Sequence, residues 1–284
     1  MPFDLIHTHN ENAEFLTGEQ LREQVPAAFS DHASPEVSDR YGFISTAAAI
    51  DILAQNGFHA TKAIQKPSRN SGNELYNDHM ITFASANRFE GDGERGTLTL
   101  YNSNNARSSC KLYAGVFRYI CSNGIVAGEG FEAKMRHSML TANGFNDLVN
   151  DQAKALPALM DNIERLKSIA LEYEQVVQLA EQAVQLRWEM EDAQNEVIPV
   201  RLGTFATMIT VHELSRPRRY GDQGADLWTV FNVAQEALLR GGLPIVGVTK
   251  RRPEGHVRKA RAIASLSENV RVNRKLWDLA NAMA

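Results

Sequence analysis

Residues 98–126 read LTLYNSNNARSSCKLYAGVFRYICSNGIV, and this stretch decides how the first half of the chain is interpreted. An apolar run that begins at Leu98 ends in the Asn- and Ser-rich cluster 102–109, and a second run from Leu112 ends at Gly124. Asn, Ser and Gly interrupt regular structure because their side chains bond nearby backbone groups or because they tolerate positive φ. The pattern therefore predicts a strand, a polar turn and a second regular element at the centre of a domain.

The second element, over residues 108–120, is compatible with two patterns. A helical stripe is formed by Leu112, Val116, Tyr119 and Ile120. A strand-like alternation is formed by Lys111, Tyr113, Gly115 and Phe117. Asn123-Gly124 follows, and glycine is common just after the last turn of a helix. We therefore predict a helix over 108–120.

The sequence around this stretch predicts an antiparallel α+β domain over residues 41–145. Ser45 can cap a helix that runs to residue 56 and ends at Gly57. Strands are predicted at 58–64, 79–86 and 97–101, and the glycines of FEGDGERG suit a hairpin between the last two. Because turns rather than helices separate the strands, the pattern favours an antiparallel sheet with packed helices over a doubly wound parallel sheet.

Residues 1–40 are polar and are predicted to form an N-terminal arm. His7 and His9 stand two residues apart after a short apolar run, and a strand would place both imidazoles on one face, where they could bind a metal. The other six histidines show no recognisable ligand spacing. A metal-dependent hydrolase is therefore kept only as a third hypothesis, and we predict no metal site.

Residues 146–198 predict a long helix of coiled-coil type. Apolar residues follow a four-three spacing at Leu159, Ile163, Leu166, Ala170, Tyr173, Val177, Ala180 and Val184, within a run between Pro157 and Pro199 that contains neither Pro nor Gly. Two interpretations stay open. The helix either forms an interface with a second copy of the chain, or it stays within one chain as a hairpin stalk or a long strut.

Residues 199–284 predict a basic, mainly helical region that packs on the α+β domain. Residues 216–275 contain thirteen Lys and Arg against five Asp and Glu, whereas residues 1–50 contain two basic and eight acidic residues. Helices are predicted at 227–240, with Asp226 as N-cap, and over 266–283. The charge asymmetry favours an anionic partner for this region, although a solvated face without function has the same composition.

Composition and the remaining motifs narrow the class of protein. With 43% hydrophobic and 23% charged residues the chain fits soluble globular proteins, and 284 residues allow one large domain or two smaller ones. It has no run of 18 apolar residues and no pattern of a signal peptide, so we expect a cytoplasmic protein without membrane contact. Cys110 and Cys121 are expected to be buried thiols rather than a disulfide. Neither a P-loop nor a GxGxxG motif occurs, and we predict no cofactor, no catalytic residues and no enzymatic activity.

Several short motifs carry a family resemblance. They are Asn102-Ser103, Ser109, Gly115, Arg118 and Cys121-Ser122-Asn123-Gly124, followed by Trp228 with Asn232, by Arg258, Lys259 and Arg261, and by the segment from Asn273 to Trp277. With these residues the chain, from about residue 41 onward, resembles the phage/plasmid-like proteins of the family called domain of unknown function 932. The resemblance implies a protein of a mobile element and supplies no activity. Where we expect an NS-x-DG-like turn the chain has NSNNARSS, so no acidic residue is carried over there.

A weaker resemblance, in architecture alone, is to the phage single-strand annealing proteins. Those proteins are oligomeric, ATP-independent and built from a small antiparallel sheet backed by a helix. This resemblance and the basic region lead to the first hypothesis, an oligomeric single-stranded DNA binding or annealing factor in recombination or replication. The second hypothesis is a protein-interaction factor, such as an inhibitor of a host defence system with a host protein as partner.

The predicted nucleic-acid contacts are basic residues together with aromatic residues that could stack on bases. The main set is Arg216, Arg218, Arg219, Tyr220, Lys250, Arg251, Arg252, Arg258, Lys259 and Arg261. A second surface would use Lys62, Lys66, Arg69, Arg107, Lys111 and Arg118, with Tyr113 or Tyr119 as a further stacking residue.

Overall fold

The computed structural model describes residues 15–38, 41–67, 73–85, 93–118, 123–126, 132–135, 142–188, 214–218, 222–249 and 252–284. The chain divides into two compact units, one of residues 8–161 and one built mainly from residues 162–284. We call the first the sheet unit and the second the helical unit. The division falls within helix α3 (Ala142–Lys167), well beyond the boundary at residue 145 that the sequence predicts.

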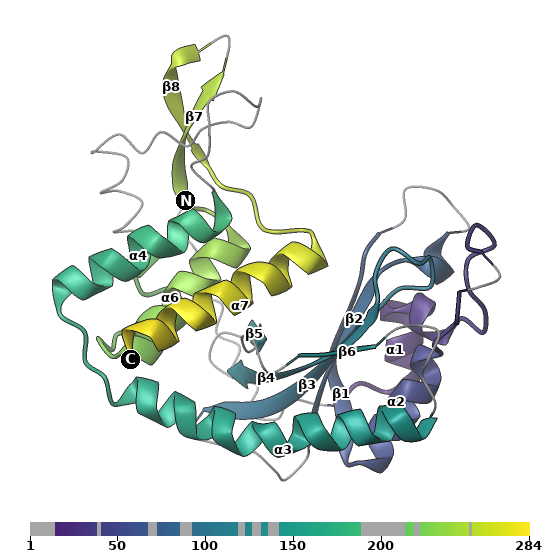
Figure 1. Ribbon diagram of the computed structural model, residues 1–284. Helices are drawn as coiled ribbons and strands as arrows, with labels where there is room; N and C mark the ends of the chain where they lie inside the picture. The colour runs from purple at the N-terminus through teal and green to yellow at the C-terminus, as the bar shows by residue number, and fades with distance from the viewer. Residues whose placement is uncertain are drawn as a thin grey trace. The chain divides into compact units, whose positions relative to one another are not determined.

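The sheet unit contains a six-stranded antiparallel sheet (Figure 1). Its strands are β1 (Phe58–Gln65), β2 (His79–Ser85), β3 (Glu94–Asn102), β4 (Cys110–Arg118), β5 (Asn123–Val126) and β6 (Glu132–Met135). The order is β1-β2-β3-β4-β5, and β6 pairs with the other half of the β4 edge. The predicted α+β class and the strands at 58–64, 79–86 and 97–101 are confirmed.

The predicted helix over 108–120 is wrong, because Cys110–Arg118 is strand β4. It pairs with β3 along its length, with Leu100 opposite Leu112 and Leu98 opposite Ala114. All of its side chains except Lys111 and Phe117 are buried. A strand that is buried on both faces loses the alternation of polar and apolar residues, so its sequence also fits a helical stripe.

The predicted N-terminal arm is in part a packed element. Helix α1 (Gly18–Gln24) and the short 3₁₀ helix η1 (Pro26–Phe29) bury Leu21, Val25 and Ala28. Thr17 caps α1 by accepting a hydrogen bond from the backbone N–H of Gln20, whose side chain accepts a bond from the Thr17 N–H. Residues 1–14, which include His7 and His9, lie outside the described residues.

Helix α2 (Thr46–Gln55) begins and ends as the sequence predicts. The Ser45 hydroxyl accepts a hydrogen bond from the N–H of Ala48, and Gly57, with a φ of +80°, follows the last turn. A second 3₁₀ helix, η2 (Glu74–Tyr76), lies between β1 and β2 in the chain. The local capping residues therefore suffice to place α2.

Helix α3 supports the sheet where two of its strands meet. Phe145, Val149 and Leu156 of α3 are buried, and the Gln152 side chain accepts a hydrogen bond of 3.2 Å from the backbone N–H of Ala114. Ala114 lies between the part of β4 that pairs with β6 and the part that pairs with β5. The Gln152 side chain thus accepts the hydrogen bond of a backbone N–H that neither β5 nor β6 pairs with.

The helical unit consists of three helices and a two-stranded ribbon in the part of the chain that the structure describes. The elements are α4 (Tyr173–Arg187), α6 (Leu227–Arg240), β7 (Pro244–Thr249), β8 (Arg252–Lys259) and α7 (Leu266–Met283). Trp228 stacks on Phe231 with ring centroids 5.5 Å apart, and Trp277 from α7 meets both rings edge-on. The predicted helices at 227–240 and 266–283 are confirmed, whereas the ribbon is a β element in a region predicted to be mainly helical.

The single helix predicted over 146–198 is interrupted. Helix α3 ends at Lys167 and α4 begins at Tyr173, because the backbone between them pairs with the residues before α6. The N–H of Leu171 donates to the carbonyl of Ala225, and the N–H of Leu227 donates to the carbonyl of Ile169. Five residues of the predicted stripe are buried within the chain: Leu159, Ile163, Leu166, Ala180 and Val184. None of the described helices is long and apolar enough to cross a membrane.

Candidate nucleic-acid interface

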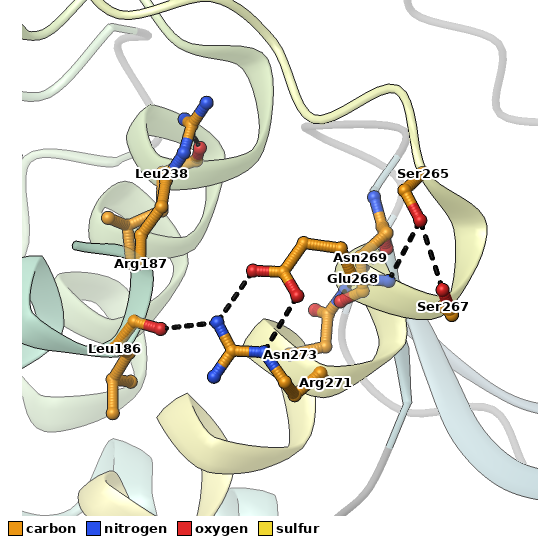
Figure 2. A network of polar contacts seen from close by, with 9 residues as sticks. All are labelled: Leu186, Arg187, Leu238, Ser265, Ser267, Glu268, Asn269, Arg271 and Asn273. Carbon is orange, nitrogen blue, oxygen red and sulfur yellow. Dashed lines mark hydrogen bonds and ion pairs between the residues drawn. The ribbon is translucent and has the colours of Figure 1, made fainter. Parts of the chain in front are cut away.

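The scaffold of the candidate interface is held by Arg187, the last residue of α4. Its guanidinium donates hydrogen bonds to the carbonyl oxygens of Leu238, near the end of α6, and of Arg261, just after β8. Figure 2 shows Arg187 beside Leu238. Burial lowers the pKa of Arg187, and the nearby charge of Glu268 acts in the opposite direction. One side chain therefore joins α4, α6 and the segment that leaves the ribbon.

A second arginine joins α4 to α7. Arg271 donates to both carboxylate oxygens of Glu268, at 2.7 and 2.6 Å, and to the carbonyl of Leu186 at 2.7 Å (Figure 2). The hydrogen bond from Arg271 is the main cause of the lowered pKa of Glu268. Because both side chains are about one-third exposed, the ion pair contributes at most about 1 kcal/mol, and its main effect is to fix the geometry.

Helices α6 and α7 are joined by buried amides. The Gln235 side chain donates a hydrogen bond of 2.6 Å to Asn273, and Asn273 in turn donates to the Asn269 side chain at 2.8 Å. Both Gln235 and Asn273 are fully buried. Together with the two arginines, these bonds make the three helices a firm base for the ribbon.

The base of the ribbon depends on two glycines between α6 and β7. Gly241 and Gly242 have φ values of +76° and +89°, and a Cβ on Gly241 would lie 2.6 Å from the Ala260 carbonyl oxygen. Backbone bonds from Gly242 to Ala260 and from Ala260 to Leu243 close this end of the ribbon, both at 2.8 Å. Only glycine permits both this backbone conformation and this close approach.

The fold brings together two basic segments that are about forty residues apart in the chain. Arg218 donates a hydrogen bond of 3.1 Å to the carbonyl of Gly241, which places the segment 214–218 against the base of the ribbon. Lys259 and Arg261 flank Ala260 on the other strand of that base, and both are exposed, as are Arg216 and Arg218. Three predicted phosphate contacts, Arg218, Lys259 and Arg261, therefore lie at the base of the ribbon, and Arg216 is two residues from Arg218 in the chain.

The other members of the main set are only partly placed. Arg252 and Arg258 belong to β8, where they pair with Thr249 and Ile245, respectively. Four predicted residues lie outside the described part of the chain: Arg219, Tyr220, Lys250 and Arg251.

Two members of the second predicted surface are buried, and for these two the prediction is wrong. The Arg118 side chain is 5% exposed, and its Nε lies 3.8 Å from a carboxylate oxygen of Glu94 on the neighbouring strand. Tyr113 is also buried, so it is no stacking residue. Arg107 and Lys66 are exposed, while Lys62 and Lys111 are half-buried, and Arg69 and Tyr119 lie outside the described residues.

Sequence reasoning missed a buried polar network at one end of the sheet. Asn102 donates to the hydroxyl of Thr46 at 2.9 Å, and Thr46 lies 2.9 Å from Nε2 of His79. The Nδ1 of His79 lies 2.9 Å from the carbonyl of Asn77, which can only accept, so Nδ1 carries the proton and Nε2 accepts from Thr46. No spacing could have revealed it, because its members come from α2, β2 and β3.

This network keeps His79 neutral. Burial lowers the pKa of His79 from its ordinary value of 6.5 to about 4. With both ring nitrogens engaged and no exposed surface, His79 has the surroundings of a structural histidine. Within the described part of the chain, no group of three or more His, Cys, Asp and Glu side chains is placed to hold a metal.

Cys110, at the start of β4, is expected to be chemically inert in the folded protein. It is fully buried, and burial raises the pKa of its thiol from 9.0 to about 12. In a Cys121→Ser background we expect alkylation of native Cys110 at pH 8 to be about 1000-fold slower than that of an exposed cysteine. Mass spectrometry of iodoacetamide-treated protein measures this, and labelling should become rapid in urea. Rapid labelling of the native protein would contradict the burial.

Known proteins resemble this chain over most of its length. The model of a family described as a domain of unknown function (DUF932) matches residues 35–277. The chain belongs to this family. The DUF932 protein is 29% identical over 272 residues to UPF0380 protein YafZ of Escherichia coli (strain K12), a match that spans 94% of this chain and 91% of YafZ. UPF0380 protein YfjQ of the same organism is 28% identical over 270 residues, again spanning 94% of this chain and 91% of YfjQ. No solved structure matches the DUF932 protein. The family resemblance carried by the motifs around Asn102 and Gly115 is confirmed.

Proposed function

We propose that this DUF932 protein binds single-stranded DNA through the base of the β7–β8 ribbon and acts as an oligomeric, ATP-independent binding or annealing factor of a mobile element. The observation that carries the proposal is the convergence of Arg218 with Lys259 and Arg261 at the base of the ribbon. Clustered cations neutralise phosphates and release the counterions that surround nucleic acids.

Two acidic residues of the helices around the ribbon oppose this role weakly. Glu268 is bonded to Arg271, and Glu236 lies 3.0 Å from Arg240 on the next turn of α6. A carboxylate that is already paired repels a phosphate less than an unpaired one. The two segments that supply the cations, 214–218 and 255–261, contain no Asp or Glu.

Stacking of bases needs exposed rings, and the rings of the helical core do not qualify. Trp228, Phe231 and Trp277 are buried against one another. Tyr220, next to Arg219 in the chain, therefore stays the predicted stacking residue. Oligomeric assembly is also part of the proposal. It rests on the resemblance in architecture to the annealing proteins, because five residues of the predicted coiled-coil stripe are buried within the chain.

The proposal predicts a salt-dependent affinity for oligonucleotides that depends on the ribbon base. Neutralising Lys259 and Arg261 with glutamine should lower the slope of log affinity against log salt by about 0.7 for each phosphate that the protein no longer neutralises. Fluorescence anisotropy with a labelled 40-nucleotide strand, from low to high salt, measures the slope. Light scattering of the same samples gives the mass with and without the strand, and an oligomer is expected.

A matched control removes two exposed cations from the sheet unit that are not predicted contacts. Arg22→Gln with Lys154→Gln changes the net charge by the same amount and should leave the slope unchanged. Absence of binding at low salt, or binding that does not weaken as salt rises, would refute the proposal. Co-purification of a host protein in that case would favour the protein-interaction hypothesis.

A further inference from the structure

The β7–β8 ribbon stands apart from the rest of the helical unit. Its strands pair with each other, with Pro244 opposite Lys259 and Val246 opposite Val257, and the register shifts between Gly247 and Thr249. Within the described part of the chain, neither strand packs extensively against a helix. Figure 1 shows the ribbon projecting from the ends of the helices α4, α6 and α7. A bare two-stranded ribbon is marginally stable by itself, so this arm depends on the closed base described above.

The ribbon exposes an apolar side chain. Val257 is 64% exposed, and only two other large apolar residues of the described chain are exposed, Leu75 at 40% and Tyr173 at 77%. Transfer of an aliphatic side chain out of water is favourable. On a ribbon that is surrounded by solvent, such a side chain stays in contact with water. Val257 is thus available for contact with a ligand that presents an apolar surface to the ribbon.

The sequence of the ribbon is strongly basic. Six of the twelve residues from 250 to 261 are Lys or Arg, and Glu254 is the only acidic one. Lys259 and Arg261 are exposed, as is Val257. A basic segment that exposes an apolar side chain fits a ligand that presents both phosphates and methyl groups.

We infer that the ribbon enters the major groove of duplex DNA and that Val257 contacts thymine methyl groups there. The major groove is about 12 Å wide and admits a two-stranded ribbon, and the thymine methyl is its apolar mark. The eight residues of β8 span about 26 Å at ~3.3 Å per residue, long enough to cross the groove. Lys259 and Arg261 at the base then lie near the phosphates that border the groove.

This inference rests on the proposed function, because it takes DNA as the ligand. It adds that the ribbon binds duplex DNA and that Val257 contacts a base. An annealing factor forms a duplex as its product, so a groove-binding arm would hold the product of the same protein. The base of the ribbon, by contrast, contacts phosphates, which single and double strands share.

The test compares two 30-bp duplexes of alternating adenine and thymine or adenine and uracil, which differ in the thymine methyl. Burial of one methyl group corresponds to a factor of about three to four in affinity. The wild-type protein is expected to bind the thymine duplex tighter by this factor. Val257→Ser, which removes both methyl groups, should reduce the ratio to about one, and Val257→Ile should retain it.

Controls separate the ribbon from other surfaces and from the proposed function. Leu75→Ser and Tyr173→Ser remove the other exposed apolar side chains and should preserve the thymine preference. Equal binding of both duplexes by the wild type, or a preference that survives Val257→Ser, overturns the inference. So does binding of single strands without binding of duplexes, but the proposed function survives these three results. Failure to bind any oligonucleotide at low salt overturns both.

Discussion

Replacing Arg118 by methionine is expected to lower the free energy of unfolding of the sheet unit by about 3–5 kcal/mol. Arg118 lies directly opposite Glu94 in the β3–β4 pairing, and both side chains are buried, at 5% and 4% exposure. Removal of the guanidinium leaves the Glu94 carboxylate charged in a dry environment without the cation opposite it. Such a buried charge costs far more than the pair itself contributes.

A double variant tests whether the unpaired charge of Glu94 causes the loss of stability. A Glu94→Gln, Arg118→Met double variant carries neither charge of the pair and should recover most of the stability. Tryptophan fluorescence does not report on the sheet unit, because Trp188, Trp228 and Trp277 all lie outside residues 8–161. Hydrogen exchange of peptides from β3 and β4 measures the stability of the sheet unit directly. Arg107→Gln, at an exposed arginine of the same stretch, should change stability by less than about 0.5 kcal/mol.

The same variants distinguish a structural role of Arg118 from a role in binding. If Arg118 contacted phosphate, as the sequence suggests, its removal would weaken oligonucleotide binding and leave β3 and β4 protected. We expect the opposite: protection of the two strands falls, and the salt dependence of binding through the ribbon base stays as in the wild type. A stable Arg118→Met protein with weakened binding would show that Arg118 contacts the nucleic acid after all.

Acidification is expected to destabilise the sheet unit by about 3 kcal/mol through His79 alone. Its folded-state pKa is about 4, against an ordinary value of 6.5. Between these values the unfolded chain binds a proton on this imidazole and the folded chain does not, so stability falls as the pH falls. The contribution is constant above pH 6.5, and its loss is complete below about pH 4.

The measurement is hydrogen exchange of β2 and β3 peptides at several pH values from neutral to mildly acidic, corrected for the intrinsic exchange rate. The side chain of His79→Asn can still donate to the Asn77 carbonyl but does not titrate. This variant should therefore be less stable than the wild type at neutral pH, and its stability should change less between pH 6.5 and about 4. His59→Gln, at an exposed histidine of β1, is the control and should follow the wild type. An unchanged slope in His79→Asn would show that other groups cause the pH dependence.

The helices that the sequence predicts correctly have their capping residues next to them in the chain. Helices α2, α6 and α7 begin at the side-chain caps Ser45, Asp226 and Ser265, which bond backbone N–H groups within the next turn. Gly57 and Gly241 follow the ends of two of them. A cap and its helix interact over three or four residues, so the sequence contains the whole cause.

The elements predicted wrongly depend on partners far away in the chain. Residues 110–118 are a strand because β3 offers a complete backbone ladder, and burial on both faces removes the alternation that would reveal it. The helix of residues 146–198 breaks because Ile169 and Leu171 bond to residues near Asp226. In both cases a long-range pairing overrides the local preference.

The sequence by itself determined the α+β class, the capped helices, the family and the inventory of cations in the C-terminal region. Only the tertiary structure decided which cations share a surface: the closed end of the ribbon brings Arg218 to Gly241, next to Lys259 and Arg261, while Arg118 lies inside beside Glu94. The physical reason is that composition and periodicity act over a few residues. Burial and the meeting of distant charges depend on strand register and on which backbone groups pair across the fold.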